Sequence, residues 1–457
     1  MTRWPLVTRF VTLNLMPEFL PWSSDLTQQA GDRLLAVLSG SSWDRWTLAL
    51  LETLDDPGVA VALEDFALAR VDNDLRPDVS RRLAPSGSAT LALLTPAGFP
   101  LAATTWAPPR TIREFLTSAA FQWKIRAPLI AAEARKAQVT GMELGTLRPR
   151  RGAVDDEFVR ACVEELIESS DPIWGGWGGA PKLLNVPALS VLLRRADLAG
   201  ARAIAFKALK AIVESPMRAE SLLLFHESDS SDWQSPSGLI LPAENADLIF
   251  LNPGRLSDFL PLYSGIHRAL LEAKEGAGLP CALRGGERFL STGASRFSAA
   301  QLSSQGPGVE KRALIRPPHL LVSHSVDSWE PLFHLSDQGA ALAAFTSYSH
   351  YHEWDHGFRQ SAETLAAAVL DHFWDDSASA FRDRFGPPLE LAPLDTPQYP
   401  VEENAIVAGA MARMGGEWLQ LAKTCLGSFT DAYVGQGVGA ARLALAVQEV
   451  VEAERME

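Results

Sequence analysis

The stretch "VLSGSSWDRWTLALLETLDD", residues 37–56, decides how the first part of the chain folds. An apolar run ends at Gly40, and a pattern typical of a helix begins almost at once, with leucines recurring on one face. A turn from a strand into a helix is a place where many folds carry chemistry. This turn holds Trp43 and Trp46, so the sequence predicts two indoles at a position suited to reactive side chains.

The segments around this turn alternate between strand and helix patterns. Residues 33–137 predict a strand, a helix, a strand, two further strands joined by a Pro-Ala-Gly turn, and a long helix, which suits a small sheet flanked by helices. From about residue 155, long Ala- and Leu-rich helices dominate, and loops rich in Gly, Ser and Pro separate them. This second part predicts a toroid or bundle of helical hairpins, with residues 138–154 as the linker.

Several short stretches resemble one known family in order and spacing. They include "VDNDLRPD" at 71–78, "LLTPAGFPL" at 93–101 and, most specifically, "GGWGGAPKL" at 175–183. The chain thus resembles the thioredoxin-domain family that includes spermatogenesis-associated protein 20. The resemblance implies a thioredoxin-like α/β domain, residues 1–137, followed by an (α/α) toroid similar to the six-hairpin glycosidases, residues 138–457. Because the chain is shorter than family members, the completeness of this ring stays open.

The chain departs from the family at the redox motif. The two cysteines of the family's Cys-x-x-Cys turn fall on Trp43 and Trp46, and its cis-proline falls on Ala89. An indole cannot form a thiolate or a disulfide, so the resemblance implies a degenerate redox site without exchange chemistry. We expect the two indoles to pack into the former active-site depression. The alternative is an exposed aromatic patch for a partner.

The family's helical part implies a carbohydrate site at one end of the barrel, built from acidic and aromatic side chains. No residue is assigned a catalytic role. The motif "GGWGGAPK" also fits a tight structural loop, since glycines allow unusual backbone angles. The candidate pocket residues are Trp177, Lys182, Asp232, Trp233, Glu244, Asn245, Glu402, Glu403 and Asn404.

Three functions follow from these observations. The leading prediction is a pseudoenzyme: a divergent member without redox activity that has a binding or scaffold role. The first alternative is a carbohydrate-active enzyme, epimerase-like or glycosidase-like, that uses the helical barrel through Glu244, Asp232, Glu402 or Glu403. The second alternative is a thiol-disulfide oxidoreductase, which the missing cysteines argue against. A protein partner and a small polar or carbohydrate ligand both stay open.

Composition limits the other classes. The net charge of −14 argues against nucleic-acid binding, and no apolar window of 18 residues indicates a membrane span. The three cysteines lie far apart in sequence, which favours a reduced, cytoplasmic setting. "SHYHEWDH" at 349–356 contains a short zinc-type spacing, His352 to His356, but its polar surroundings favour a turn. No metal and no cofactor are predicted.

Overall fold

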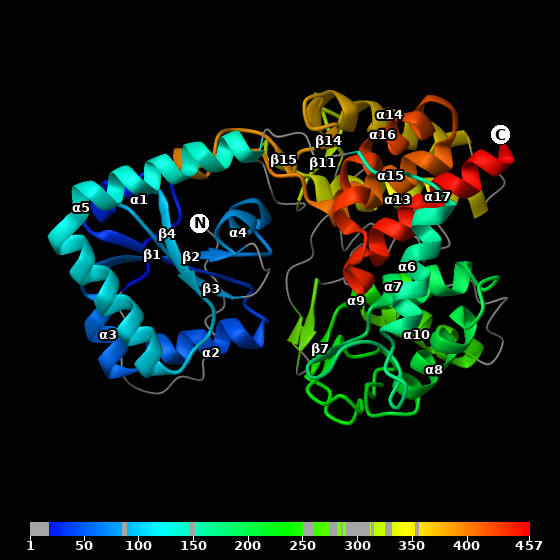
Figure 1. The fold of residues 1–457 in the computed structure, drawn as a ribbon, viewed down its shortest axis with the longest axis horizontal. Coiled ribbons are helices and arrows are strands. Elements are labelled where there is room, and N and C mark those ends of the chain that lie inside the picture. Colours follow the sequence, from blue (N-terminus) through cyan, green and yellow to red (C-terminus); the bar gives the residue numbers. More distant parts are fainter. Residues whose placement is uncertain are drawn as a thin grey trace. The chain divides into compact units, whose positions relative to one another are not determined.

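The structure of the protein is a computed structural model, in which the chain divides into two compact units (Figure 1). Unit 1 comprises residues 1–143 and 388–396, and unit 2 comprises residues 144–387 and 397–457. The expected boundary after residue 137 falls inside helix α5 (Pro109–Gly145). The residues that the structure describes are 18–84, 89–145, 151–249, 259–273, 281–284, 287–288, 311, 315–324, 331–351 and 356–457.

Unit 1 is built on a four-stranded sheet in the order β2-β1-β3-β4. Strand β1 runs parallel to β2 and antiparallel to β3, and β4 runs antiparallel to β3. In register, Leu34 of β1 pairs with Phe66 of β2, and Leu35 pairs with Leu94 of β3. The strands are β1 (Leu34–Gly40), β2 (Phe66–Asp72), β3 (Thr90–Leu94) and β4 (Pro100–Thr104).

Helices cover both faces of this sheet because β1 is apolar on both. Its side chains alternate, so Leu34 and Leu38 pack against α2 (Arg45–Leu54), α3 (Pro57–Leu63) and α5. Leu35 and Val37 face the opposite layer, formed by α1 (Leu26–Ala30), α4 (Pro77–Leu83) and residues 388–396. Such a strand, buried along its whole length, is typical of the centre of an α/β layer structure.

Residues 388–396 belong to unit 1 although they come from the second half of the sequence. Three of their leucines are buried in the core beside α1 and α4. Arg76 forms an ion pair with Glu390, whose Oε2 also accepts a hydrogen bond from Trp22 Nε1 at 3.1 Å. The same guanidinium pairs with Asp78 at 3.0 Å. The sequence placed this stretch in the helical domain, and the structure assigns it to unit 1.

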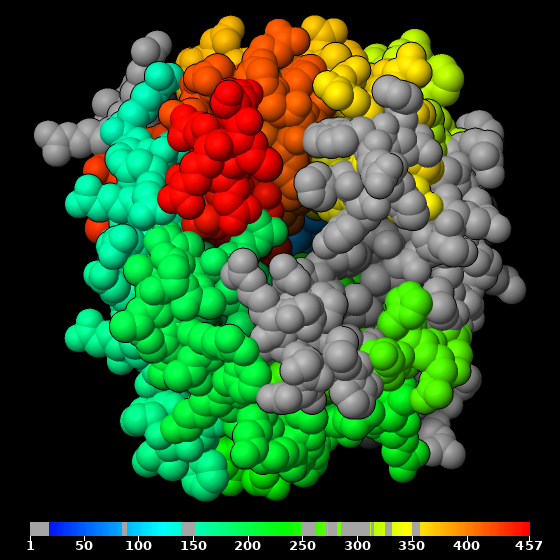
Figure 2. All heavy atoms as spheres, turned by 90° about the vertical axis from the view of Figure 1, so that its right-hand side faces the viewer, coloured from blue at the N-terminus to red at the C-terminus, as the bar shows by residue number. Residues whose placement is uncertain are grey.

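Unit 2 is rich in helices, as predicted. Its last helix contacts α6, α7, α15 and α16, so the beginning and the end of this unit pack together. Figure 2 shows the red C-terminal helix at the surface, beside green and orange segments of the same unit. The helices are α6 (Asp156–Glu168), α7 (Val186–Arg194), α8 (Ala201–Val213), α9 (Pro242–Ile249), α10 (Leu260–Ala273), α13 (Leu335–Tyr351), α14 (His356–Phe373), α15 (Val401–Met414), α16 (Gly416–Tyr433) and α17 (Ala441–Met456).

Short strands connect these helices. They pair two residues at a time, in small antiparallel sheets. Within the described ranges, no helix is long and apolar enough to cross a membrane. The strands are β5 (Lys182–Leu183), β6 (Glu227–Ser228), β7 (Leu239–Ile240), β8 (Leu283–Arg284), β9 (Glu287–Arg288), β10 (Ile315–Arg316), β11 (Leu321–Val322), β12 (Phe333–His334), β13 (Trp374–Asp375), β14 (Ala380–Phe381) and β15 (Arg384–Phe385).

A buried side-chain amide joins the start of α9 to an extended segment before it. Asn245 Oδ1 accepts a hydrogen bond from the backbone N–H of Leu224 at 2.7 Å, and its Nδ2 donates to the carbonyl of Leu224 at 3.0 Å. Nδ2 also donates to the carbonyl of Leu241, one helical turn back, at 3.1 Å. We call this arrangement an amide clamp.

The amide clamp recurs on two further helices. On α13, Gln338 exchanges two hydrogen bonds of 2.8 Å with Val322 and donates to the carbonyl of His334. On α15, Asn404 bonds Phe381 in the same way, at 2.8 and 2.9 Å, and donates to the carbonyl four residues back. The three amides are fully buried. Each therefore satisfies the backbone N–H and C=O of one buried extended residue, which lies in a two-residue strand for Val322 and Phe381 and in an isolated bridge for Leu224.

We expect Gln338→Leu to destabilise unit 2 by about 2–4 kcal/mol, because it leaves the N–H and C=O of Val322 buried without partners. The matched control is Gln360→Leu on the neighbouring α14, where the side chain is exposed and the change should stay within about 0.5 kcal/mol. Urea unfolding followed by far-UV circular dichroism measures both. Equal midpoints for the two variants would contradict the structural role of the clamp.

Candidate functional site

The "GGWGGAPK" loop surrounds a buried lysine. Lys182 is fully buried, and its Nζ donates to Asp171 Oδ2 at 2.6 Å and to the carbonyl of Ser231 at 2.9 Å. The ammonium lies 5.2 Å from the centroid of the Trp233 ring, which is itself buried. A buried charge needs a counter-charge and hydrogen bonds, and this one has both. Lys182 and Trp233 therefore hold the loop together and do not line an open pocket mouth.

The glycines of this loop allow close packing on the Trp233 ring. Gly176 has φ of +73°, and a Cβ there would lie 2.7 Å from the ring. Trp177 is also buried, and its Nε1 donates to the carbonyl of Leu166 at 2.8 Å. Burial opposes ionisation of Asp171, but hydrogen bonds from Lys182 and two backbone amides hold the pKa of its carboxyl below the ordinary value. The motif is therefore explained by packing.

Asp232 closes a turn next to this loop. Its Oδ1 accepts hydrogen bonds from the Ser230 hydroxyl and, at 3.1 Å, from the backbone N–H of Gln234. The bond from Ser230 is the main reason why the pKa of Asp232 lies below its usual range. This is therefore a turn-closing aspartate.

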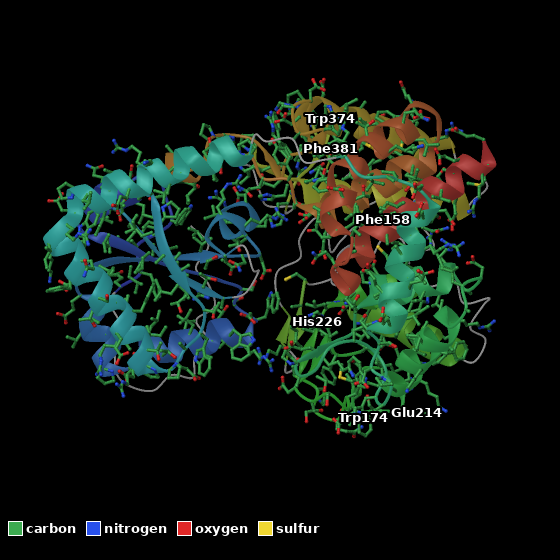
Figure 3. All side chains as sticks on the ribbon, in the orientation of Figure 1. Phe158, Trp174, Glu214, His226, Trp374 and Phe381 are labelled. Atoms are coloured by element: carbon green, nitrogen blue, oxygen red, sulfur yellow. The ribbon has the colours of Figure 1, made fainter. Side chains whose placement is uncertain are left out.

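Glu244 pairs with a histidine that the sequence interpretation missed. His226 Nδ1 lies 2.8 Å from Glu244 Oε2, and the two side chains are 25% and 18% exposed. His226 comes two residues after the clamped Leu224, and Glu244 comes directly before Asn245, so the amide clamp positions both. Figure 3 shows His226 in the green part of unit 2. Burial favours the neutral ring, yet the Glu244 carboxylate raises the pKa of His226 above its ordinary value.

A second pair repeats this geometry on α13. His324 Nδ1 lies 2.8 Å from Asp337 Oδ2, with His324 two residues after the clamped Val322 and Asp337 directly before Gln338. The Asp337 side chain is fully buried, and the His324 ring lies 4.8 Å from the ring of His334. A short sequence pattern could have predicted both pairs. An acidic residue and an amide residue follow each other at the start of a helix, and a histidine lies two residues after a buried extended residue.

The third clamp, on α15, has a carboxylate at each of the two positions that form the histidine–carboxylate pair in the other clamps. Asp383 follows the clamped Phe381 by two residues, and Glu403 directly precedes Asn404. Asp383 is buried, Glu403 is half-buried, and Glu402 is exposed. Of the predicted pocket residues, Asn245 and Asn404 thus serve as clamps, and Glu244 and Glu403 occupy the positions that these clamps define.

The two indoles at the turn between β1 and α2, Trp43 and Trp46, lie in different surroundings. Trp43 lies directly before Asp44, which caps α2. Its Nε1 donates a hydrogen bond to Asp74 Oδ2 at 2.7 Å. Trp46 is 40% exposed and lies 5.7 Å, between ring centroids, from the equally exposed Trp106. Ala89 is buried at the start of β3. Trp43 is therefore fixed by a hydrogen bond, and Trp46 contributes to an exposed aromatic pair.

The described residues offer few side chains for thiol or metal chemistry. Cys162 and Cys425 are buried free thiols, and burial raises the pKa of both, that of Cys162 to about 12. Within the ranges that the structure covers, no cluster of three or more His, Cys, Asp or Glu side chains could hold a metal ion. His352 lies outside the described residues, as does the side chain of His356.

Comparison with known proteins gives structural neighbours only. No protein-family model and no curated protein matches the chain. A cellobiose 2-epimerase from Spirochaeta thermophila is 14% identical, covering 66% of this chain and 98% of its own, with a TM-score of 0.46. A sugar epimerase from a ruminal bacterium is 11% identical over 65% of this chain and 86% of its own, with a TM-score of 0.44.

An unsaturated glucuronyl hydrolase specific for heparin is 10% identical over 65% of this chain and 97% of its own, with a TM-score of 0.45. These similar structures have the α/α toroid fold. They correct the leading prediction from the sequence, a pseudoenzyme with a binding or scaffold role, because the neighbours are sugar epimerases and glycosidases.

We expect Glu244→Gln to lower the pKa of His226, because the neutral amide no longer stabilises the imidazolium. In the wild type the pKa is raised above the ordinary value of about 6.5. The stabilisation from this pair is therefore fully present below about pH 6.5 and is lost as pH rises through the folded-state pKa. NMR titration of histidine Cε1–H signals measures the shift, with His226→Gln to assign the signal. An unchanged pKa in Glu244→Gln would disprove the coupling.

Proposed function

We propose that unit 2 binds a sugar and catalyses proton transfer at a carbon atom of it, as an epimerase or isomerase does. The observation that carries this proposal is the paired imidazole and carboxylate at the start of α9, His226 with Glu244, and its repetition on α13. A histidine oriented by a carboxylate is a suitable general base near neutral pH.

In the proposed reaction, the neutral His226 ring removes the proton next to the carbonyl of the open-chain sugar. The C–H bond breaks, the imidazole takes the proton, and the electron pair passes into an enediolate. Return of a proton to the other face gives the epimer, and return to the neighbouring carbon gives the isomer. Glu244 fixes the ring through Nδ1, so Nε2 is the nitrogen left for substrate. His324 with Asp337 is the candidate for the second proton-transfer group.

Glycoside hydrolysis is the second candidate, favoured by the third clamp alone. Hydrolysis requires a carboxylic acid and a carboxylate on opposite sides of the glycosidic bond. Asp383 and Glu403 are carboxyl groups at the positions that His226 and Glu244 hold in the first clamp. A sugar bound over this third clamp would therefore meet groups suited to hydrolysis.

We further propose that unit 1 is a thioredoxin-like domain and that the whole chain is a divergent member of the family that it resembles. Two observations support this proposal. The sheet order β2-β1-β3-β4, with a parallel β1–β2 pair and antiparallel β3 and β4, fits such a domain. Trp43 stands at the turn between β1 and α2, where the family carries its first cysteine.

Solvent-exchange NMR tests the proposed reaction. The protein is incubated in D₂O with glucose, mannose or cellobiose, and deuterium incorporation next to the carbonyl is followed together with epimer formation. We expect incorporation with at least one sugar, and a loss of about 10²–10⁴-fold in His226→Gln. Because the base must be neutral, activity should rise with pH through the raised pKa of His226.

The matched control is Glu214→Gln, an exposed carboxylate at the end of α8, compared with Glu244→Gln. Glu214→Gln should retain full activity, and Glu244→Gln should lose most of it. Release of a monosaccharide from cellobiose without deuterium incorporation would favour hydrolysis, and its loss in Glu403→Gln would assign it to the third clamp. Exchange that survives in both His226→Gln and His324→Gln would overturn the proposed roles.

A further inference from the structure

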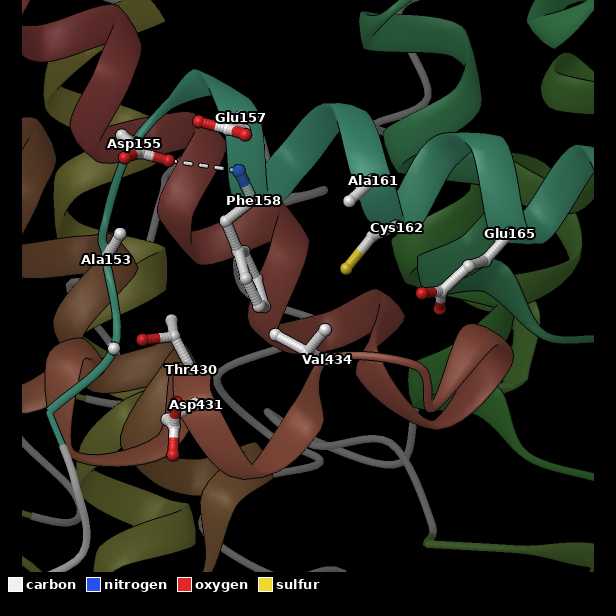
Figure 4. Close-up of a pocket in the computed structure, with 11 residues that line it drawn as sticks. Ala153, Asp155, Glu157, Phe158, Ala161, Cys162, Glu165, Thr430, Asp431 and Val434 are labelled. Atoms are coloured by element: carbon white, nitrogen blue, oxygen red, sulfur yellow. Dashed lines mark hydrogen bonds between the residues drawn. The ribbon is translucent and has the colours of Figure 1, made fainter.

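A pocket of about 250 Å³ in unit 2 lies between the start of α6 and the end of α16 (Figure 4). Carboxylates in its lining accept backbone hydrogen bonds. Asp155 accepts one from the N–H of Phe158 at 3.0 Å. The two oxygens of Glu165 accept one each from Gly435 and Gly437. These bonds join the two helix ends, so packing within unit 2 explains the pocket, whereas packing within unit 1 leaves one edge of its sheet unexplained.

The two edges of the sheet in unit 1 differ in what covers them. At the β2 edge, the backbone N–H of Leu20 donates to the carbonyl of Leu68 at 2.7 Å, and Leu20 forms a parallel bridge with Ala69. At the other edge, β4 is the last strand in the order of the sheet, and no described segment pairs with its outer side. Ala102 and Ala103 point to opposite faces of β4, and both are exposed. The outward N–H and C=O groups of β4 are therefore accessible to another chain.

The β4 edge lacks the features that keep open strands from pairing. Natural proteins place charged side chains, interior prolines or bulges on such edges. In β4, the only proline is the first residue, and the register shift against β3 lies at this same end, which leaves residues 102–104 in regular pairing. No charged residue occurs in residues 83–109, although the net charge of the chain is −14. Two copies of this acidic protein can therefore approach each other here without opposing like charges.

Two exposed indoles lie beyond the end of β4. Trp106 follows the last residue of β4 by two positions, and its ring centroid lies 5.7 Å from that of Trp46 at the start of α2. The guanidinium of Arg45 lies 4.9 Å from the centroid of the Trp46 ring. Indoles held in place in this way are typical anchors of protein interfaces, because they bury a large area at a small cost in side-chain entropy. The strand thus offers backbone hydrogen bonds, and the indoles offer apolar surface.

From these features we infer that β4 pairs with β4 of a second copy of this chain, in antiparallel orientation. A strand that pairs with this edge must be extended, uncharged and open on one side, and β4 of a second copy meets these requirements. The two sheets then join into one continuous sheet. A two-fold axis at Ala103 brings Trp106 of each copy near Pro100 of the other, because these residues lie equally far from the axis along the strand.

This pairing closes at two copies. It uses the β4 edge of both, and the outer edges of the joined sheet are then the two β2 edges, each covered by the segment at Leu20. A two-fold interface uses the same surface on both partners and leaves none for a third copy. Because one short strand and one aromatic pair form a small interface, we expect a Kd of about 1–100 µM.

Sedimentation velocity of the full-length protein tests the pairing. We expect a reversible monomer–dimer equilibrium between about 1 and 300 µM protein. Trp106→Ala should raise the Kd about tenfold, because it removes an aromatic anchor from the interface. A chain that stays monomeric over this range, or one that forms open-ended assemblies, would overturn the inference.

Charge substitutions at the axis locate the interface. Ala103→Lys and Ala103→Glu should each raise the Kd about fivefold or more, because like charges then face each other across the axis. An equimolar mixture of the two variants should form a heterodimer with a Kd within about threefold of the wild-type value, because the charges are then opposite. A general loss of stability cannot produce this rescue, and the urea midpoints should stay unchanged because Ala103 is exposed.

The matched control is Ile173→Lys, which adds the same charge at a side chain of unit 2 that is 71% exposed. It should change the Kd less than twofold. Dimers that persist in both Ala103 variants, or a mixture of the two that stays monomeric, would show that the copies do not pair through β4.

Discussion

The buried side-chain amide is the interaction on which unit 2 depends. The short strands between its helices pair over two residues only, so their backbone groups cannot be satisfied by a long ladder. Asn245, Gln338 and Asn404 each act as a substitute strand for one extended residue. Leaving those groups unpaired in the interior would cost more than the hydrogen bonds themselves contribute.

The same interaction positions candidate chemistry. An extended chain turns the side chain of residue i+2 to the same side as residue i, and the amide fixes residue i against a helix start. His226 and Glu244 meet for that reason, and His324 meets Asp337 in the same way. The same arrangement thus stabilises the fold and places two titratable side chains close together. The clamp fixes the two positions but not the residue types, so the three clamps hold different acid–base groups.

Much of the fold could be predicted from local patterns. Short continuous apolar runs indicate the buried strands of unit 1, and Ala- and Leu-rich stretches indicate the helices after residue 155. The packing of "PLELAPLDT", residues 388–396, in unit 1 could not be predicted, because it depends on contacts with Arg76 and Trp22, which are far away in the sequence. Predicted pocket residues such as Trp233 and Lys182 are buried against each other, which no local pattern distinguishes from a pocket lining.

The functional prediction failed for a related reason. The prediction rested on Trp43 and Trp46, which the resemblance matches to two cysteines, and these positions bear only on thiol chemistry in unit 1. They do not bear on the imidazole–carboxylate pairs of unit 2, which has a separate core. Two cores in one chain can lose and keep chemistry independently, so the loss of one motif says little about the other core.

The assignment of residues 388–396 to unit 1 has a topological consequence. The chain passes between the units three times, after residues 143, 387 and 396, and not once as in a protein with serial domains. One proteolytic cut cannot separate the units, and a fragment ending near residue 143 would lack Leu389, Leu391 and Leu394 from its core. During synthesis, α1 and α4 can pack on the second face of the sheet early, but its core is complete only after Leu389, Leu391 and Leu394 have been made.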